Sequence, residues 1–337
     1  MRKLSKKQRE WNLAHSKKAV RTLQKRNRNQ QQHDKPKGST SNNENIIVLT
    51  APRIFSLVSD QSETLLFFEN AFSKIKDCQV RQKIFFNLYG VEVVTVDAVM
   101  YLIALIKNMK RINAFKVICQ GNMPRNAEAR MTLERVGFFE YVHSDVRKSV
   151  FSGDKRTRII QGKDADGVVA GTLCEFVHEV SQKDRLSTKR LYPMVMELMT
   201  NTRQHAYRHE HGVMDDRWYI YAENAEEKIR FVFLDTGVGI PSTVRKGFAE
   251  IIQRFVKKDD AKLIASALKG DFRTETNEAH RGKGLPQIYG DSCQGLIENL
   301  TVISGSGKCF VNNLCEIEEV QLEASLWGAL FCWDFIK

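Results

Sequence analysis

The stretch "FLDTGVGIP", residues 233–241, places Asp235 between a run of apolar residues and two glycines, Gly237 and Gly239. Glycine opens backbone conformations closed to other residues and lets another group approach without a Cβ in the way. The stretch therefore predicts a strand that ends at Asp235 and turns sharply. The Asp235 carboxylate either closes this turn or accepts a hydrogen bond from an amine of a ligand.

A second stretch with candidate binding or catalytic residues is "MELMTNTRQHA", residues 196–206, which has the pattern of a helix. Glu197, Asn201 and His205 stand four residues apart and share one helix face. A carboxamide oxygen is a hard ligand for Mg²⁺, and a carboxylate one turn away can orient or deprotonate a nucleophile. The alternative interpretation is an ordinary solvated helix face.

The third stretch is "HRGKGLPQIY", residues 280–289, in which Gly282 and Gly284 flank Lys283 just before a predicted helix. Free backbone N–H groups at a helix start attract phosphate. Without the other two stretches, this one predicts only a loop.

In their order along the chain, 196–206, 233–241 and 280–289, the three stretches resemble the motifs of the Bergerat-fold (GHKL) ATPases, the superfamily of gyrase, heat-shock chaperones and histidine kinases. The similarity extends over residues 165–337 and includes "LTVISGSGK" (300–308) and "WGALFCWDF" (327–335) as counterparts of the closing strands. The resemblance implies an α/β sandwich in which helices cover a mixed sheet, with ATP and Mg²⁺ as ligands.

The resemblance also implies roles for individual residues. Glu197 corresponds to the general base or water-positioning carboxylate, Asn201 to the Mg²⁺ ligand and Asp235 to the acceptor for the adenine amino group. The remaining implied binding residues are Gly237, Gly239, Gly282, Lys283 and Gly284.

Other parts of the chain bear on the same resemblance. Residues 242–281 correspond to the ATP lid, and His205 and His280 flank the expected site. Many family members have Gly-Thr in the closing strand, where this chain has Gly328-Ala329 and lacks the hydroxyl. His178 lies too close to Asn201 to be the phosphoacceptor of a sensor kinase, so we expect a structural role for it.

Residues 46–150 alternate strand-like and helix-like runs, which predicts a separate α/β domain. The stretch "IFFNLYGVEVVTVDAVMYLIALIKNMKR" (84–111) is similar to the STAS domains of anti-sigma-factor antagonists. Those domains carry a phosphorylatable Ser after an Asp, whereas Asp97 is followed by Ala98. The similarity therefore implies the fold and not the phosphoswitch.

Charge separates residues 1–45 from the rest. The formal net charge is +12, and residues 1–38 hold 13 basic residues against two acidic ones, a net +11. The remaining 39 basic and 38 acidic residues leave +1. This polar segment predicts a disordered tail or linker that could contact nucleic-acid phosphates, or act merely as a solubilising tail.

Cellular location and association are less constrained. Seven singly spaced cysteines predict reduced core thiols, and neither a membrane span nor a secretory signal is apparent, so we expect a cytoplasmic protein without membrane contact. No apolar stripe indicates a dimer, which leaves the oligomeric state open.

Three functions are compatible with these motifs. The first is an ATPase switch, a hydrolase in which lid closure on Mg-ATP controls how the STAS-like domain or the tail meets a protein partner. The second is a Ser/Thr protein kinase of the anti-sigma-factor type, because the same groups serve a hydroxyl acceptor. The third is a nucleic-acid-binding regulator that uses residues 1–38. All three imply a regulator of bacterial type.

Overall fold

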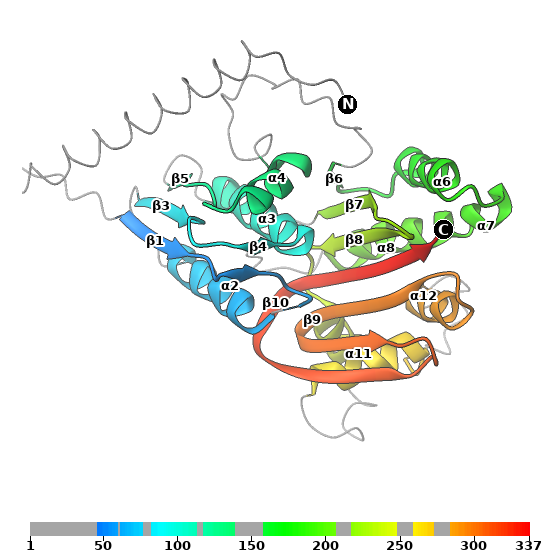
Figure 1. Ribbon diagram of the computed structural model, residues 1–337. Helices are drawn as coiled ribbons and strands as arrows, with labels where there is room; N and C mark the ends of the chain where they lie inside the picture. Colours follow the sequence, from blue (N-terminus) through cyan, green and yellow to red (C-terminus); the bar gives the residue numbers. More distant parts are fainter. Residues whose placement is uncertain are drawn as a thin grey trace, which may run out of the picture. The chain divides into compact units, whose positions relative to one another are not determined.

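The computed structural model describes residues 46–59, 61–76, 82–112, 117–138, 158–206, 217–247, 259–272 and 284–337 (Figure 1). These residues all belong to one compact unit, residues 44–337. The predicted tail, residues 1–45, lies outside the described residues. Within the described ranges, no helix is long and apolar enough to cross a membrane.

The first part of this unit is a small parallel sheet in the order β1-β3-β5. Each step between neighbouring strands is a helical crossover in the same direction, and right-handed crossovers of this kind place both helices on one face. The elements are β1 (Ile46–Thr50), β2 (Ile54–Phe55), α2 (Gln61–Lys76), β3 (Gln82–Asn87), β4 (Val93–Val94), α3 (Val96–Ile112), β5 (Val117–Gly121) and α4 (Ala127–Arg135). Strands β2 and β4 form a separate two-residue parallel pair.

Helix α3 is apolar on all sides, and the structure explains why. Every residue from Val96 to Ile106 is buried, including Asp97 and Ala98, the position at which the STAS resemblance lacks a hydroxyl. A helix that is apolar all round is normally buried all round. Residues of α3 share one core with β3 and with β8 (Lys228–Asp235) of a second sheet.

The second part is a five-stranded sheet in the order β6-β7-β8-β10-β9. Its strands are β6 (Ile160–Gly162), β7 (Trp218–Asn224), β8 (Lys228–Asp235), β9 (Glu298–Val311) and β10 (Ile317–Ile336). The four strand pairs that the described residues form in this sheet are all antiparallel, so the expectation of a mixed sheet was wrong. Tight hairpins force antiparallel pairing for β7–β8 and β9–β10, and the short edge strand β6 adds another antiparallel pair.

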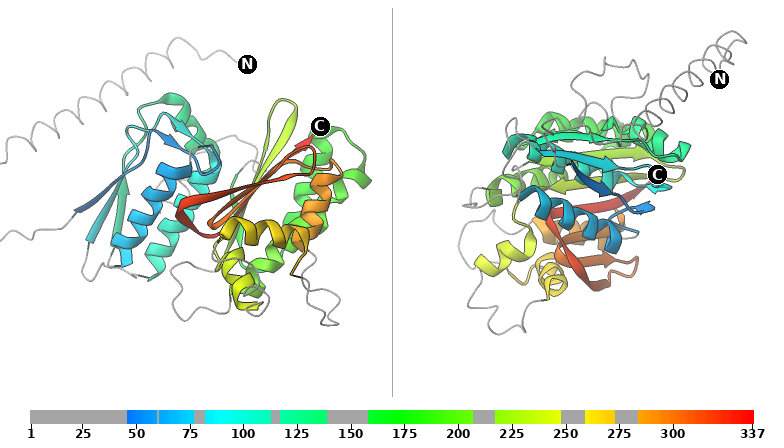
Figure 2. Two further views of the ribbon diagram at one scale, coloured as in Figure 1. Left: turned by 90° about the horizontal axis from the view of Figure 1, so that it is seen from below. Right: turned by 90° about the vertical axis from the view of Figure 1, so that its left-hand side faces the viewer.

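Helices cover one face of this second sheet (Figure 2). They are α6 (Gly167–Ser181), α7 (Arg185–Lys189), α8 (Leu191–Ala206), α9 (Ile240–Gly247), α11 (Asp260–Lys269) and α12 (Gly284–Cys293). Strand β8 shows why both faces of the sheet are buried. Phe231 and Phe233 belong to the core under these helices, whereas Val232 and Leu234 belong to the core that includes α2 and α3.

Hydrogen bonds join the first part to β9 and β10. The backbone N–H of Trp327 donates to the hydroxyl of Tyr101 at 2.9 Å. The Ser325 N–H donates to Glu69 Oε1 at 2.9 Å, and Lys308 Nζ donates to the Val58 carbonyl at 2.8 Å. Residues from the predicted domains 46–150 and 165–337 therefore share a common core.

The predicted lid, residues 242–281, is only partly compatible with the structure. Helix α11 lies within the predicted lid, yet Ile264, Ala265 and Leu268 are buried in the sheet core, so this helix is not a lid element. The lid segments 248–258 and 273–281 lie outside the described residues.

The prediction that all cysteines are reduced was wrong for one pair, because Cys293 and Cys315 form a disulfide. Their wide separation along the chain gave no spacing signal for pairing. Cys174, Cys309 and Cys332 are buried core thiols as expected, and Cys78 lies outside the described residues.

Candidate functional site

Strand β8 ends at Asp235, as the sequence predicted. Phe231 and Phe233 face the helix-covered side, and the two-residue period of a strand places Asp235 on that same side. Asp235 is half-buried. The N–H of Gly237 donates to Asp235 Oδ1 at 2.7 Å, so one carboxylate oxygen fixes the turn.

The turn after Asp235 is held from two sides. Thr236 is buried, and its hydroxyl donates to the Arg217 carbonyl at 2.9 Å and accepts from the Arg217 N–H at 3.0 Å. Gly239 has φ +82°, where a side chain is strained, and a Cβ there would approach Ser304 Oγ to 2.7 Å. The predicted need for glycine at position 239 is therefore explained by both conformation and space.

Ser304 and Gly328 link this turn to the closing strands. Ser304 Oγ accepts from the Ile240 N–H at 2.9 Å and donates to the Gly328 carbonyl at 2.6 Å. Gly328 has φ +91°, and a Cβ at this position would overlap the Asp235 carbonyl oxygen. Strand β10 can thus pass beside Asp235 only because residue 328 is glycine.

Glu197 and Asn201 lie one turn apart on α8, and both are half-buried. Gly284, the first residue of α12, lies against Glu197 so closely that a Cβ would overlap the Glu197 side chain. Burial raises the pKa of the Glu197 carboxyl. A raised pKa makes its carboxylate a better proton acceptor than an ordinary surface glutamate.

Contacts at the far end of α12 keep the helix beside α8. Arg190, which immediately precedes α8, donates to Asp291 Oδ1 at 3.1 Å and to Gln294 Oε1 at 2.7 Å. Asp291 is buried, and its Oδ2 has no hydrogen-bond partner. The contact between Gly284 and Glu197 is therefore supported by a pairing of α12 with the start of α8.

Asn201 is the residue of this set that we predicted as a Mg²⁺ ligand. Among the described residues, no three His, Cys, Asp or Glu side chains gather in a way that could hold a metal. Mg²⁺ commonly takes one or two protein oxygens and completes its shell with phosphate oxygens and water. The amide oxygen of Asn201 is a donor of this kind, and the Glu197 carboxylate lies one turn away on α8.

The predicted site residues fall into two groups in the structure. Glu197 meets Gly284 where α8 and α12 pack together, with Asn201 one turn farther along α8, and Asp235, Gly237 and Gly239 form the turn after β8. Both groups lie on the helix-covered face of one sheet. Gly282, Lys283 and His280 lie outside the described residues, as does the side chain of His205 in the last turn of α8.

Sequence reasoning missed the parts played by Thr236, Ser304 and Gly328. Ser304 and Gly328 lie inside "LTVISGSGK" and "WGALFCWDF", but only the folded chain shows that they bind the Asp235 turn. His178 has the structural role that we expected, because its Nδ1 hydrogen-bonds the Lys183 carbonyl at 2.7 Å.

Comparison with protein-family models gave no match, and comparison with curated proteins gave none either.

Proposed function

We propose that this chain is an Mg-ATP-binding regulatory protein that acts as an ATPase switch. The observation that carries the proposal is the contact of a half-buried Glu197, whose pKa is raised, with Gly284 at the start of α12. The acid is held where a helix N-terminus exposes backbone N–H groups, which favour phosphate.

Each predicted residue has a task in this proposal. Glu197 orients or deprotonates water, Asn201 ligates Mg²⁺, and Asp235 accepts a hydrogen bond from the adenine amino group. Gly237 and Gly239 shape the adenine floor, and the start of α12 faces the phosphates. Hydrolysis of ATP needs positioning and charge neutralisation more than covalent chemistry by the protein, which these groups can supply.

The contacts between β10 and α2 and α3 give the switch a route to a protein partner. Gly328 lies against Asp235, and its neighbour Trp327 donates to Tyr101 on α3. Nucleotide binding at Asp235 therefore affects β10, the strand that supports the first part of the unit. We place the partner surface on that first part.

Calorimetry with Mg-ATP tests the proposal. The wild-type chain should release or absorb heat on binding, Asp235→Asn should abolish that signal, and Asp184→Asn should leave it unchanged. Asp184 is an exposed helix N-cap, for which Asn is an equally good residue, so it is a matched control. No heat and no thermal stabilisation at millimolar ATP would overturn the proposal.

A Ser/Thr protein kinase is the second candidate, because Glu197 would serve a serine hydroxyl as well as water. Incubation with γ-labelled ATP and candidate partner proteins separates the two reactions. Label on a protein supports the kinase, and free phosphate alone supports the ATPase.

A nucleic-acid-binding regulator is the third candidate, favoured by the net charge of +11 in residues 1–38 of an otherwise nearly neutral chain. Each phosphate contact should contribute a salt slope of about 0.9 on double-stranded DNA, so binding should weaken steeply as salt rises. Deletion of residues 1–40 should remove this binding. Unchanged affinity of the shortened chain would exclude a role for the tail.

A further inference from the structure

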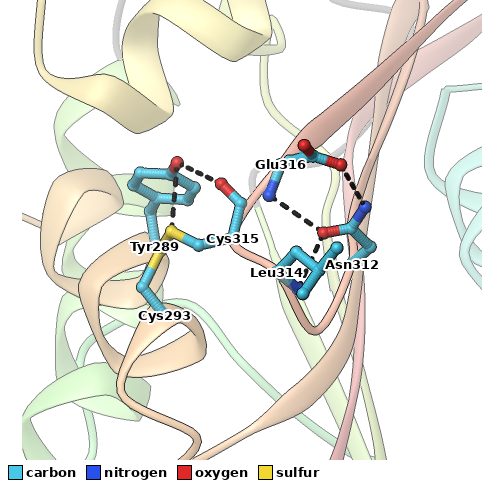
Figure 3. The surroundings of a disulfide bond; sticks show 6 residues. All are labelled: Tyr289, Cys293, Asn312, Leu314, Cys315 and Glu316. Atoms are coloured by element: carbon cyan, nitrogen blue, oxygen red, sulfur yellow. Dashed lines mark hydrogen bonds between the residues drawn. A yellow bond between two sulfur atoms is a disulfide. The ribbon is translucent and has the colours of Figure 1, made fainter.

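The disulfide between Cys293 and Cys315 joins the last residue of α12 to the turn between β9 and β10 (Figure 3). Its Cα atoms are 4.9 Å apart, and the two residues are 22 positions apart in the chain. Cys293 is exposed and Cys315 is half-buried. An exposed disulfide is open to attack by thiols in solution, whereas structural disulfides are usually protected.

The surroundings of the two sulfur atoms differ. The hydroxyl of Tyr289, one turn before Cys293 on α12, donates to the Cys315 carbonyl at 2.8 Å (Figure 3). The same hydroxyl lies 3.3 Å from Cys315 Sγ. Because Cys293 is exposed and Cys315 is half-buried against this hydroxyl, Cys293 is the accessible point of attack and Cys315 is the leaving sulfur.

The turn that carries Cys315 does not depend on the disulfide. Asn312 Oδ1 accepts from the N–H groups of Leu314 and Glu316, both at 2.9 Å, and the Asn312 N–H donates to the Glu316 carbonyl at 3.0 Å. Cys315 has φ +64° within this turn. Opening the disulfide therefore leaves the hairpin folded and removes the covalent bond between the hairpin and the C-terminal end of α12.

Helix α12 connects this disulfide to the candidate site. The helix is ten residues long; Cys293 ends it, and Gly284 begins it against Glu197. Without the disulfide, the C-terminal end of α12 keeps the Tyr289 hydrogen bond and the contacts of Asp291 and Gln294 with Arg190. Its position then depends on hydrogen bonds and ion pairs instead of a covalent bond.

We propose that Cys293–Cys315 is a reversible redox-modification site for low-molecular-weight thiols, and that its state controls ATP turnover through α12. The control of ATP turnover rests on the proposed function. A thiolate attacks Cys293 Sγ, the bond between the two Cys sulfurs breaks, and the electron pair leaves on Cys315, which is then protonated. A second thiolate attacks the thiol's own sulfur in the mixed disulfide and releases Cys293, so two thiols become one small disulfide and the protein becomes a dithiol.

The redox site is tested by differential alkylation of the full chain after incubation with mixtures of reduced and oxidised glutathione. Cys293 and Cys315 should change together from protected to alkylated as the mixture becomes reducing, and brief exposure should give a mixed disulfide on Cys293. Cys119→Ser, a change outside the disulfide, should leave this behaviour unchanged. A mixed disulfide on Cys315, or two cysteines alkylated under every condition, would overturn the assignment.

Control of the site is tested by Mg-ATP turnover in oxidised and reduced protein. Reduction should lower turnover by about 2- to 30-fold, the range of a modest coupling between linked elements. The double variant Cys293→Ser/Cys315→Ser should match the reduced protein and no longer respond to glutathione. Equal turnover in both states would overturn the control of the site, whereas no ATP binding in either state would overturn the proposed function and leave the alkylation result standing.

Discussion

The backbone N–H of Trp327 on β10 donates to the hydroxyl of Tyr101 on α3 at 2.9 Å, and the next residue, Gly328, lies directly against the Asp235 carbonyl. Trp327 is in a stretch where β10 shifts register against β9. Because of this irregularity, the Trp327 N–H bonds a side chain of the first part of the unit and not strand β9. One short segment of β10 therefore touches both α3 and the turn that carries Asp235.

Replacing Tyr101 with Phe should destabilise the chain by about 0.5–1.5 kcal/mol, the usual net contribution of a hydrogen bond, because the variant loses the bond from the Trp327 N–H. The ring is fully buried, and its edge contacts with Phe68 and Phe72 are retained in the variant. Unfolding by urea measures the difference in free energy. Tyr89→Phe is the matched control, because Tyr89 is 55% exposed and should change stability little.

Replacing Gly284 with Ala should disrupt the candidate site, because the added Cβ overlaps the Glu197 side chain and forces α12 or Glu197 to move. ATP turnover should fall by about 100-fold, as expected when a catalytic group is displaced by about 1 Å. Gly290→Ala on the same helix is the control. A Cβ added at Gly290 would lie within 4 Å of no heavy atom of the described residues, apart from its chain neighbours and the backbone of its own helix. That variant should be as active as the wild type and about 0.5–1 kcal/mol more stable. Normal turnover in Gly284→Ala would contradict the role given to this contact.

Replacing Glu197 with Ala should preserve binding of Mg-ATP and reduce turnover by about 10²- to 10⁴-fold, the usual contribution of a general base. Binding is measured by calorimetry and turnover by phosphate release. Glu175→Ala, an exposed position on α6, should change neither quantity. If Glu197→Ala lost binding and turnover together, Glu197 would be a binding residue and not the base.

The sequence predicted those elements whose residues show a clear period. The strand-like and helix-like runs that alternate over residues 46–150 correspond to β1, α2, β3, α3, β5 and α4. The paired strands β2 and β4 and the edge strand β6 have only two or three residues each and too few positions to show a period. The resemblance implied a closing strand only at 327–335, since the charged residues Glu318 and Glu319 interrupt the earlier half of β10.

The candidate site was predictable as a set of residue types but not as a set of contacts. The glycine spacing around Asp235 shows that the chain turns there, yet it contains no information about which strand passes beside the turn. Gly328 and Ser304 are distant in sequence and become partners of this turn only through the β8–β10 and β9–β10 pairings. The disulfide was missed for the same reason.

Replacing Asp97 with Asn should remove a loss of stability that the wild type suffers as pH rises. Asp97 is buried and accepts a 2.6 Å hydrogen bond from the Leu57 N–H. Burial raises its pKa above the ordinary value of 3.8, although hydrogen bonds from Thr95 and backbone N–H groups oppose this effect. The folded chain then binds more protons than the unfolded chain between these two pKa values, so stability is greatest below 3.8 and falls as pH rises through the raised value.

Urea unfolding of both proteins at a series of pH values from the acid range to neutrality measures this effect. The free energy of unfolding of the wild type should fall relative to Asp97→Asn by about 1.4 kcal/mol for each unit by which the pKa is raised. Asp184→Asn is a control in which the change of stability with pH has the opposite sign. Hydrogen bonds from the Ser187 side chain and backbone lower the pKa of the exposed Asp184 carboxyl. The wild type should gain stability relative to Asp184→Asn as pH rises from the lowered pKa to the ordinary one. Parallel pH profiles for the wild type and Asp97→Asn would show that Asp97 has an ordinary pKa and is not desolvated between the two sheets.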